Sequence, residues 1–325
     1  MRAAIYDHFG NPADVTQLRD VAPPDPGKGE VRIRTILSSI HNHDLWTTRG
    51  SYGYKPALPA IGGTEAVGTI DAVGEGVDAA LVGKRVTAAG IHGTWAEFFI
   101  APANGVVPLP DAISDEAAAQ LIAMPFSAIS LLDFLTVTKG DWIVQTAANG
   151  AVGKVMAALA AERGIHLVNL VRRHEAVQAL ADLGMTNIVV TSDADWIDQV
   201  KAITGPDGAR AAVDSVGGAV GAGLVEVLGN EGELVVFGTA TGDPMPLNSG
   251  AIIFKHITIK GFWGAKVGAA MDNAKKGKLI GELVTLAAQG KLPLPVGGIF
   301  DLADAAKAMD AALVPGRAGK VLLRA

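Results

Sequence analysis

The middle of the chain alternates short Val- and Ile-rich runs with segments of helical periodicity. The runs include "DWIVQTA", "IHLVNLV", "NIVVT" and "GELVVFG", and apolar residues recur at helical spacing in the segments that separate them. Apolar strands joined by helices indicate a parallel sheet that is covered on both faces. We therefore expect a doubly wound α/β domain in this part of the chain.

The flanking residues have a different pattern. The N-terminal part carries short apolar runs broken by Gly, Pro and Asp, which is typical of β-rich structure. Ser114, followed by two acidic residues, is expected to begin a long Ala-rich helix. After Ile257 the pattern loosens into strand-like "ITIKGFW" and "KVLLRA" around one expected helix at "GELVTLAAQG". We predict one domain of residues 1–118 and 259–325, and a second, doubly wound domain of residues 119–258.

A glycine-rich turn follows the first strand of the alternating region. In "WIVQTAANGAVGKVMAALA", Gly150 and Gly153 take the second and third glycine positions of G-x-G-x-x-G, and Ala148 replaces the first. Gly150 would let the backbone approach a pyrophosphate at the helix N-terminus, and Gly153 would let the helix pack close to the strand. The turn predicts a dinucleotide site; the alternative is a glycine-rich turn without a cofactor.

The next strand ends in Arg172, Arg173 and His174. These residues lie near the place, about 20 residues along, where a carboxylate would hold the ribose 2′-hydroxyl of NAD. Arginines there can pair with a 2′-phosphate instead. NADPH is thus expected in preference to NADH, the alternative being a pair of solvated arginines at a strand end.

Composition excludes several classes of function. The 325 residues carry a net charge of −6, and no cluster of Lys and Arg interleaved with aromatics is present, so we expect no nucleic-acid partner. No apolar run is long enough to cross a membrane, and a cytoplasmic location is expected. The absence of cysteine excludes disulfides, thiolate zinc sites and thiol nucleophiles.

One short stretch, "SIHNHDLW", places His41, His43 and Asp44 within four residues. If this segment is extended, the two histidines point to opposite sides and do not readily share one ion. Taken alone, the stretch looks like a ligand cluster, but the two histidines are not expected to hold one metal ion between them.

The sequence resembles the medium-chain dehydrogenase/reductase superfamily. "LPAIGGTEAVGTIDAVGEGV" at residues 58–77 is similar to its N-terminal signature, and the domain order is similar over essentially the whole chain. The resemblance implies a GroES-like catalytic domain joined to a Rossmann domain. In the zinc enzymes of this superfamily three ligand positions match His41, Thr64 and, approximately, Met124. Thr and Met are poor zinc ligands, so no metal site is expected. With this resemblance, "SIHNHDLW" is interpreted as part of a zinc-free active-site wall, in which His41 or His43 contacts substrate or the nicotinamide ribose and Asp44 braces the loop.

Two zinc-free branches compete within this resemblance. "RGSYGYKP" and "AANGAVG" are similar to segments of quinone oxidoreductases, whereas "AIYDHFGNPADVTQL", "HGTWAEFF", "LVRRHEAVQAL" and above all "IIFKHITIKGFW" resemble NADPH-dependent 2-enoyl thioester reductases. We expect hydride transfer to an activated C=C bond of a small-molecule enoyl thioester or enone. The alternatives are an NADPH:quinone oxidoreductase, a zinc alcohol dehydrogenase that uses His41 or His43, and a nucleotide-binding protein without enzymatic activity.

The resemblance also implies individual roles. Tyr52 matches a tyrosine that activates the substrate, and whether His41 or His43 donates a proton beside it stays open at this point. Lys320 matches a C-terminal lysine near the cofactor, and relatives of this type commonly form homodimers through edge strands. The resemblance implies cofactor contacts at the pyrophosphate loop, the adenosine phosphate site, the turn past the nicotinamide ribose and the segment beside the nicotinamide: Asn149, Gly150, Ala151, Val152, Gly153, Arg172, Arg173, His174, Phe237, Gly238, Thr239, Ala240, Phe262, Trp263 and Gly264.

Overall fold

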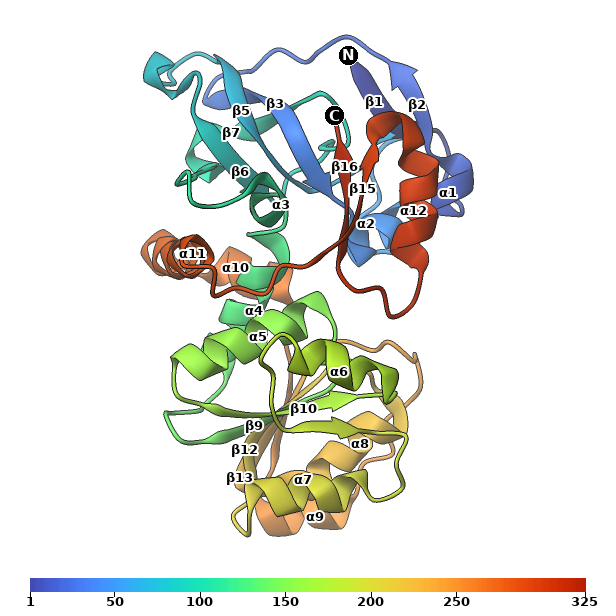
Figure 1. The fold of residues 1–325 in the computed structure, drawn as a ribbon, viewed down its shortest axis with the longest axis vertical. Helices are drawn as coiled ribbons and strands as arrows, with labels where there is room; N and C mark the ends of the chain where they lie inside the picture. Colours follow the sequence, from blue (N-terminus) through green and yellow to red (C-terminus); the bar gives the residue numbers. More distant parts are fainter. The chain divides into compact units, whose positions relative to one another are not determined.

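The computed structural model describes residues 1–325 and divides the chain into two compact units. The first unit contains Met1–Met124 and Glu282–Ala325, and the second contains Pro125–Gly281 (Figure 1). The predicted boundaries, at 118/119 and 258/259, differ from these. The second boundary falls later because β14 (Thr258–Gly261) pairs in parallel with β13 (Leu228–Val236) and so belongs to the sheet of the second unit.

The first unit is β-rich. Its strands are β1 (Arg2–Tyr6), β2 (Gln17–Asp20), β3 (Glu30–Ser39), β4 (Ala60–Ile61), β5 (Glu65–Val73), β6 (Arg85–Ala89), β7 (Phe98–Pro102), β8 (Val107–Pro108), β15 (Val296–Asp301) and β16 (Lys320–Arg324). One sheet has the order β15-β16-β3-β5-β6-β8, with β7 also paired to β3, and a smaller sheet has the order β2-β1-β4. All of these pairs are antiparallel except β15 with β16.

Helices complete the first unit. They are α1 (Pro12–Val15), α2 (Asn42–Arg49), α3 (Asp115–Ala118) and α12 (Ala305–Leu313). Helix α12 buries Ala308 and Met309 in a cluster that also contains Leu45 of α2 and the fully buried Trp95. This packing fixes α2, which carries the histidine-rich stretch, against the rest of the unit.

The second unit is a doubly wound sheet. Its strands are β9 (Trp142–Gln145), β10 (His166–Val171), β11 (Ile188–Val190), β12 (Ala209–Asp214), β13 and β14, and its helices include α5 (Ala151–Glu162), α6 (Glu175–Ala181), α7 (Trp196–Thr204), α8 (Gly218–Val227), α9 (Ser249–Lys255) and α10 (Gly264–Ala270). The order β11-β10-β9-β12-β13-β14 is all parallel and has its switch point between β9 and β12, which is the Rossmann arrangement. The predicted fold class is confirmed.

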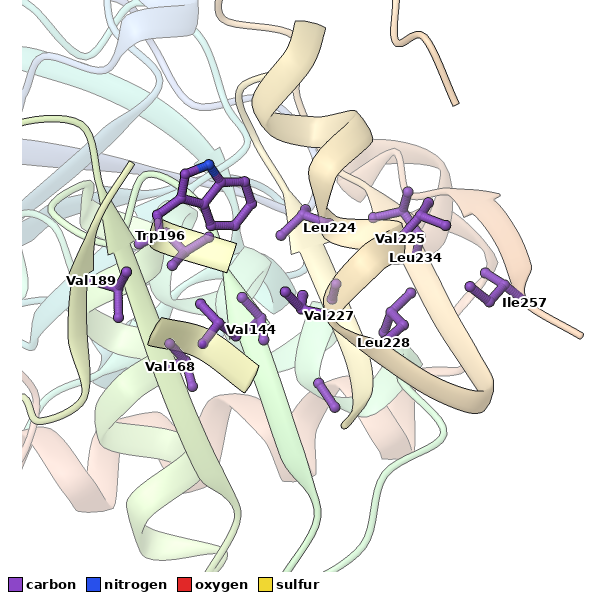
Figure 2. Close-up of a cluster of buried hydrophobic side chains, with 14 residues drawn as sticks. Val144, Val168, Val189, Trp196, Leu224, Val225, Val227, Leu228, Leu234 and Ile257 are labelled. Carbon is purple, nitrogen blue, oxygen red and sulfur yellow. The ribbon is translucent and has the colours of Figure 1, made fainter. Parts of the chain in front are cut away.

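Both faces of this sheet are covered. Helices α5 and α6 lie on one face and α7, α8 and α9 on the other (Figure 1). Figure 2 shows how Val144, Val168 and Val189 from adjacent strands meet Trp196 of α7 and Leu224 of α8. Because these strands are buried on both sides, their sequences are continuous apolar runs rather than alternating ones.

Two helices differ from the sequence expectation. Ser114 caps a helix as predicted, but α3 is a single turn and a second helix, α4 (Ala123–Phe134), follows it. The amide groups of Ile122 and Ala123 donate to the Glu65 carboxylate, so the chain breaks here instead of continuing one helix. Helix α11 (Asn273–Ala288) begins earlier than the predicted "GELVTLAAQG", because Asp272 Oδ1 accepts the Lys275 amide 2.8 Å away. None of the helices combines the length and the apolar composition that crossing a bilayer requires.

Candidate active site

The stretch "SIHNHDLW" is helical and not extended. His41 precedes the first turn of α2, and Asp44 in that turn accepts the His41 amide at 2.8 Å. Gly50 ends the helix in the left-handed conformation, as is common at helix C-termini. The expectation that the two imidazoles point to opposite sides is therefore wrong: the rings of His41 and His43 stack with their centroids 5.0 Å apart and an interplanar angle of 13°.

His41 is fully buried, and it belongs to a network of hydrogen-bonded polar side chains. Its Nε2 lies 2.7 Å from Glu65 Oε2 and 2.8 Å from Ser39 Oγ, and its Nδ1 lies 3.2 Å from Lys320 Nζ. Burial, together with the Lys320 ammonium, holds the pKa of His41 well below its ordinary value, so the ring is neutral. An ammonium donating to Nδ1 leaves the proton on Nε2, which donates to Glu65.

Glu65 and Lys320 are themselves buried. Besides His41, the Glu65 carboxylate accepts the amides of Ile122 at 2.6 Å and Ala123 at 2.9 Å, as expected for a structural carboxylate. Burial raises the pKa of Glu65 to about 7, against the opposing effect of these amides, and burial lowers the pKa of Lys320 to about 8. The Lys320 ammonium is directed at His41, which the sequence did not indicate.

His43 belongs to a second series of hydrogen-bonded side chains, and this series reaches the surface. Its Nε2 lies 2.8 Å from Thr64 Oγ1, and that hydroxyl donates to Asp44 Oδ1 at 2.7 Å. The His43 side chain is 23% exposed, whereas that of Asp44 is 1% exposed. The arrangement is a carboxylate, a hydroxyl and an imidazole in series, with the imidazole at the exposed end.

Tyr52 lies beside this imidazole in the loop after α2. The ring centroids of Tyr52 and His43 are 5.9 Å apart, and Trp46, which is exposed on α2, lies 6.4 Å from the Tyr52 ring. The Tyr52 amide donates to the Trp46 carbonyl and so holds the loop against the helix. The structure thus brings together Tyr52 and His43 at one surface, while His41 lies beneath them.

The predicted nucleotide-binding residues lie in the second unit, after the carboxyl ends of parallel strands, where ligands of open α/β sheets bind. Asn149 and Gly150 follow β9 and are exposed, and α5 begins at Ala151. A Cβ on Gly153 would lie 2.7 Å from the Ala148 carbonyl oxygen, so this glycine is required for the helix to approach the turn. A Cβ on Gly150 would meet the Ala147 carbonyl oxygen at 3.2 Å and nothing closer.

The residues after β10 are also exposed. Arg172 and Arg173 face solvent, and His174 Nε2 lies 2.9 Å from Asp193 Oδ1. Neither arginine makes an ion pair within the chain. Two exposed, uncommitted guanidinium groups at this strand end fit an anionic ligand such as a ribose phosphate.

The residues after β13 and β14 divide into exposed and buried ones. Thr239 and Ala240 are exposed, and Phe237 and Gly238 are partly buried. The Phe262 ring is buried against Phe134 and Phe237, at centroid distances of 5.2 and 5.9 Å, so its side chain is part of the core. Trp263 precedes α10 and is 66% exposed, although strand periodicity favours a buried residue there.

Sequence reasoning missed the contacts of three polar residues. Ser39 contacts the His41 ring, Thr64 joins His43 to Asp44, and Asp214 accepts the Val216 and Gly217 amides and the Thr146 hydroxyl at the end of β12. The signal for Asp214 is a lone carboxylate that ends an apolar strand in "AAVDSVG". No local signal marks Ser39, because its contact with the His41 ring depends on the fold and its other partner, Glu65, is 26 residues away.

Comparisons with known proteins agree with this architecture. Residues 27–111 match the alcohol dehydrogenase GroES-like domain, and residues 151–276 match the zinc-binding dehydrogenase family. The chain is 32% identical over 321 residues to a mitochondrial enoyl-(acyl-carrier-protein) reductase of Caenorhabditis elegans, which covers 96% of this chain and 92% of the relative.

Solved structures are similar over the full chain. A Bacillus thuringiensis protein described as an NADPH:quinone reductase is 29% identical with a TM-score of 0.91, covering 100% of this chain and 98% of that one. The Escherichia coli quinone oxidoreductase complexed with NADPH is 26% identical with a TM-score of 0.86, covering 100% of both chains. A GroES-like unit and a Rossmann unit in one chain define a two-domain dehydrogenase. The chain belongs to the medium-chain dehydrogenase/reductase superfamily and is an oxidoreductase.

Because one of the matching families is named for zinc binding, the fit of zinc to this chain matters. Both ring nitrogens of His41 have protein partners, and the Thr64 hydroxyl donates its proton to Asp44. A threonine and Met124 are not the strong ligands that catalytic zinc requires. No group of three or more His, Cys, Asp or Glu side chains is placed to hold a metal ion. These residues do not fit a catalytic zinc.

Proposed function

We propose that the protein is a zinc-independent, NADPH-dependent reductase of activated C=C bonds in 2-enoyl thioesters or enones. The observation that carries the proposal is the partly exposed pair of proton-bearing groups, His43 and Tyr52, at a site whose donor set does not fit zinc. Similarity to an enoyl-(acyl-carrier-protein) reductase over nearly the whole chain supports the substrate class.

The second unit supports NADPH as the cofactor. In this proposal the turn of residues 149–153 holds the pyrophosphate at the start of α5, and Arg172, Arg173 and His174 bind the 2′-phosphate. Residues 237–240 and 262–264 border the nicotinamide half, with Phe262 contributing its backbone because its ring is buried. A related structure that contains NADPH supports the assignment.

The chemistry asks the protein to stabilise charge on the substrate carbonyl. When bound, the reduced nicotinamide supplies a hydride. As the β-carbon accepts it, negative charge develops on the carbonyl oxygen, and a phenol such as that of Tyr52 stabilises this charge by donating a hydrogen bond. Without zinc, hydrogen-bond donors of the chain perform this task.

The test is an assay of the purified protein with NADPH and NADH against crotonyl-CoA, a simple enone and a quinone, with metal content measured on the same sample. We expect NADPH oxidation with the enoyl or enone substrate and no stoichiometric zinc. Tyr52→Phe is expected to lower kcat about 10²-fold or more while NADPH binding stays unchanged. Stoichiometric zinc with alcohol oxidation, or full turnover by the variant, contradicts the proposal.

A second candidate is an NADPH:quinone oxidoreductase. It is favoured by the TM-score of 0.91 to the Bacillus thuringiensis protein described by that activity. The exposed aromatic side chains Trp46 and Tyr54 near Tyr52 suit a flat ring as well as an enone. The same assay separates the two functions, since this alternative predicts turnover with quinones alone.

A homodimer is part of the proposal. Strand β14 is an edge strand that pairs with β13 only, and its residue Ile259 is exposed. Just before it, Ile253 and Phe254 of α9 are 64% and 85% exposed. An unpaired strand edge beside exposed apolar side chains favours pairing with a second copy about a twofold axis. A cytoplasmic location stays a prediction.

A further inference from the structure

The direction of each hydrogen bond around Thr64 is fixed. An ionised carboxylate only accepts, so the Thr64 hydroxyl gives its proton to Asp44 Oδ1, 2.7 Å away. Thr64 Oγ1 must then accept from His43 Nε2, 2.8 Å away. His43 therefore carries a proton on Nε2 whether its ring is neutral or charged.

The other ring nitrogen of His43, Nδ1, is available to a ligand. His43 Nδ1 makes no hydrogen bond within the chain, and the side chain is partly exposed. An imidazolium at this position has its second N–H on Nδ1, while the buried Asp44 carboxylate, 3.4 Å from Nε2, stabilises its charge. A buried carboxylate behind a histidine with one free nitrogen is an arrangement suited to proton transfer.

The neighbouring candidates are less suited. Both nitrogens of His41 are engaged and its side chain has no exposed surface. The Tyr52 hydroxyl makes no hydrogen bond within the chain, so no buried carboxylate supports it as Asp44 supports His43.

We infer that His43 is the catalytic residue that protonates the α-carbon of the substrate, with Thr64 and Asp44 as positioning residues and Tyr52 as the hydrogen-bond donor to the carbonyl. The inference rests on the proposed function. The β-carbon accepts a hydride from NADPH, which becomes NADP⁺, and the π electrons of the C=C bond move to form an enolate. As the enolate collapses, the α-carbon bonds to the Nδ1 proton, and the neutral imidazole is reprotonated from solvent.

Several titratable groups face His43. Asp44 comes from its own helix, His41 stacks on it from the end of β3, and Tyr52 lies in the following loop. Glu65 of β5 and His92 of the loop after β6 complete the set, because the charge of His43 acts on the pKa of each. A change in pH profile is therefore assigned to His43 only by comparing variants.

The test compares wild type with His43→Gln on the enoyl or enone substrate that wild type reduces. A glutamine amide can still donate a hydrogen bond to Thr64, but it is not an acid and cannot transfer a proton to the substrate. We expect kcat to fall about 10²- to 10⁴-fold while NADPH binding is unchanged. Because the step uses a proton carried by His43, the pH dependence of kcat is expected to differ between wild type and the variant.

Thr64 provides a second pair of variants that keeps His43. Thr64→Val breaks the link to Asp44, so its pH profile of kcat should differ from that of wild type, and Thr64→Ser should restore the wild-type profile. Wild-type turnover and an unchanged pH profile in His43→Gln overturn the inference alone. If wild type reduces none of the substrates in the panel, the proposed function itself is overturned. Failure of the inference and failure of the proposed function are therefore distinguishable. If His43→Gln does not fold, identical profiles of Thr64→Val and wild type overturn the inference.

Discussion

At the scale of single residues, the buried network of Glu65, His41 and Lys320 makes the free energy of unfolding depend on pH. Burial raises the pKa of Glu65 from 4.5 to about 7, so between these values the folded state holds a proton that the unfolded state has lost. Burial lowers the pKa of Lys320 from 10.5 to about 8, so between these values the unfolded state holds the extra proton. The contribution of these two groups to stability therefore falls from pH 4.5 to 7 and rises from pH 8 to 10.5.

Lys320→Met tests this term. Without the ammonium, which lowers the pKa of Glu65, that pKa should rise further, so the stability of the variant should keep falling above pH 7 and should lack the rise above pH 8. Adding Glu65→Gln removes the unpaired buried charge and should recover on the order of 3 kcal/mol near pH 9. Urea unfolding at intervals from pH 5 to 10 measures this. Lys307→Met, at an exposed position, is the control, and equal pH profiles for Lys320→Met and wild type contradict the prediction.

Which residues form the candidate site was only partly predictable from the sequence. Tyr52, His41 and His43 stood out by type and by their place in a family pattern, but their division into a surface pair and a buried residue depends on α2 being helical. From the sequence we expect this stretch to be extended, and Asp44 explains why it is helical instead. Its carboxylate caps the helix and also anchors Thr64, 20 residues later. Contacts of this kind join side chains distant in sequence, and no local pattern indicates them.

At the scale of elements, α5 shows how one glycine positions a whole helix. A Cβ at residue 153 would come within 2.7–2.9 Å of three backbone atoms of Ala148. Backbone cannot move aside as a flexible side chain can, so the helix itself would have to shift from the turn. Sequence reasoning assigned this role to Gly153 from its motif position, and the distances agree with it.

Gly153→Ala should therefore destabilise the protein by about 1–3 kcal/mol and weaken NADPH binding. Gly277→Ala is the matched control, because Gly277 lies inside α11 with nothing within 4 Å of an added Cβ. The control should stabilise the helix by about 0.5–1 kcal/mol, since alanine loses less backbone entropy than glycine. Thermal unfolding of both variants measures the effects, and a Gly153→Ala protein as stable as wild type refutes the close-packing argument.

Element boundaries were less predictable than element types. The Ala-rich segment after Ser114 is uniformly helical in composition, yet Glu65 takes the amides that would continue the helix and so separates α3 from α4. Helix α11 begins before its apolar positions do, because a cap at Asp272 sets its start. Periodicity indicates which segments are helices, whereas caps and tertiary hydrogen bonds determine where they begin and end.

At the scale of the whole molecule, the topology followed from the sequence because strand and helix alternate over the second unit. Alternation with short connections allows few arrangements other than a doubly wound parallel sheet. The extent of that sheet did not follow, since the alternating pattern loosens after Ile257 and only the pairing of β14 with β13 assigns this strand to the sheet. The two units have separate sheets and separate buried clusters, so each carries its own half of the proposed chemistry.

The edge at β14 gives the prediction that belongs to the whole molecule. If a second copy covers this edge, Phe254 of α9 is buried in the dimer, and Phe254→Glu places a charge in an apolar interface. We expect wild type to sediment as a dimer at micromolar concentrations and the variant to sediment as a monomer with its fold retained. Val314→Glu is the matched control, since Val314 is also apolar and 53% exposed but lies in the first unit. A monomeric wild type, or a Phe254→Glu variant that stays dimeric, contradicts pairing at this edge. Dimerisation lost equally in both variants would show that added charge, and not this edge, is responsible.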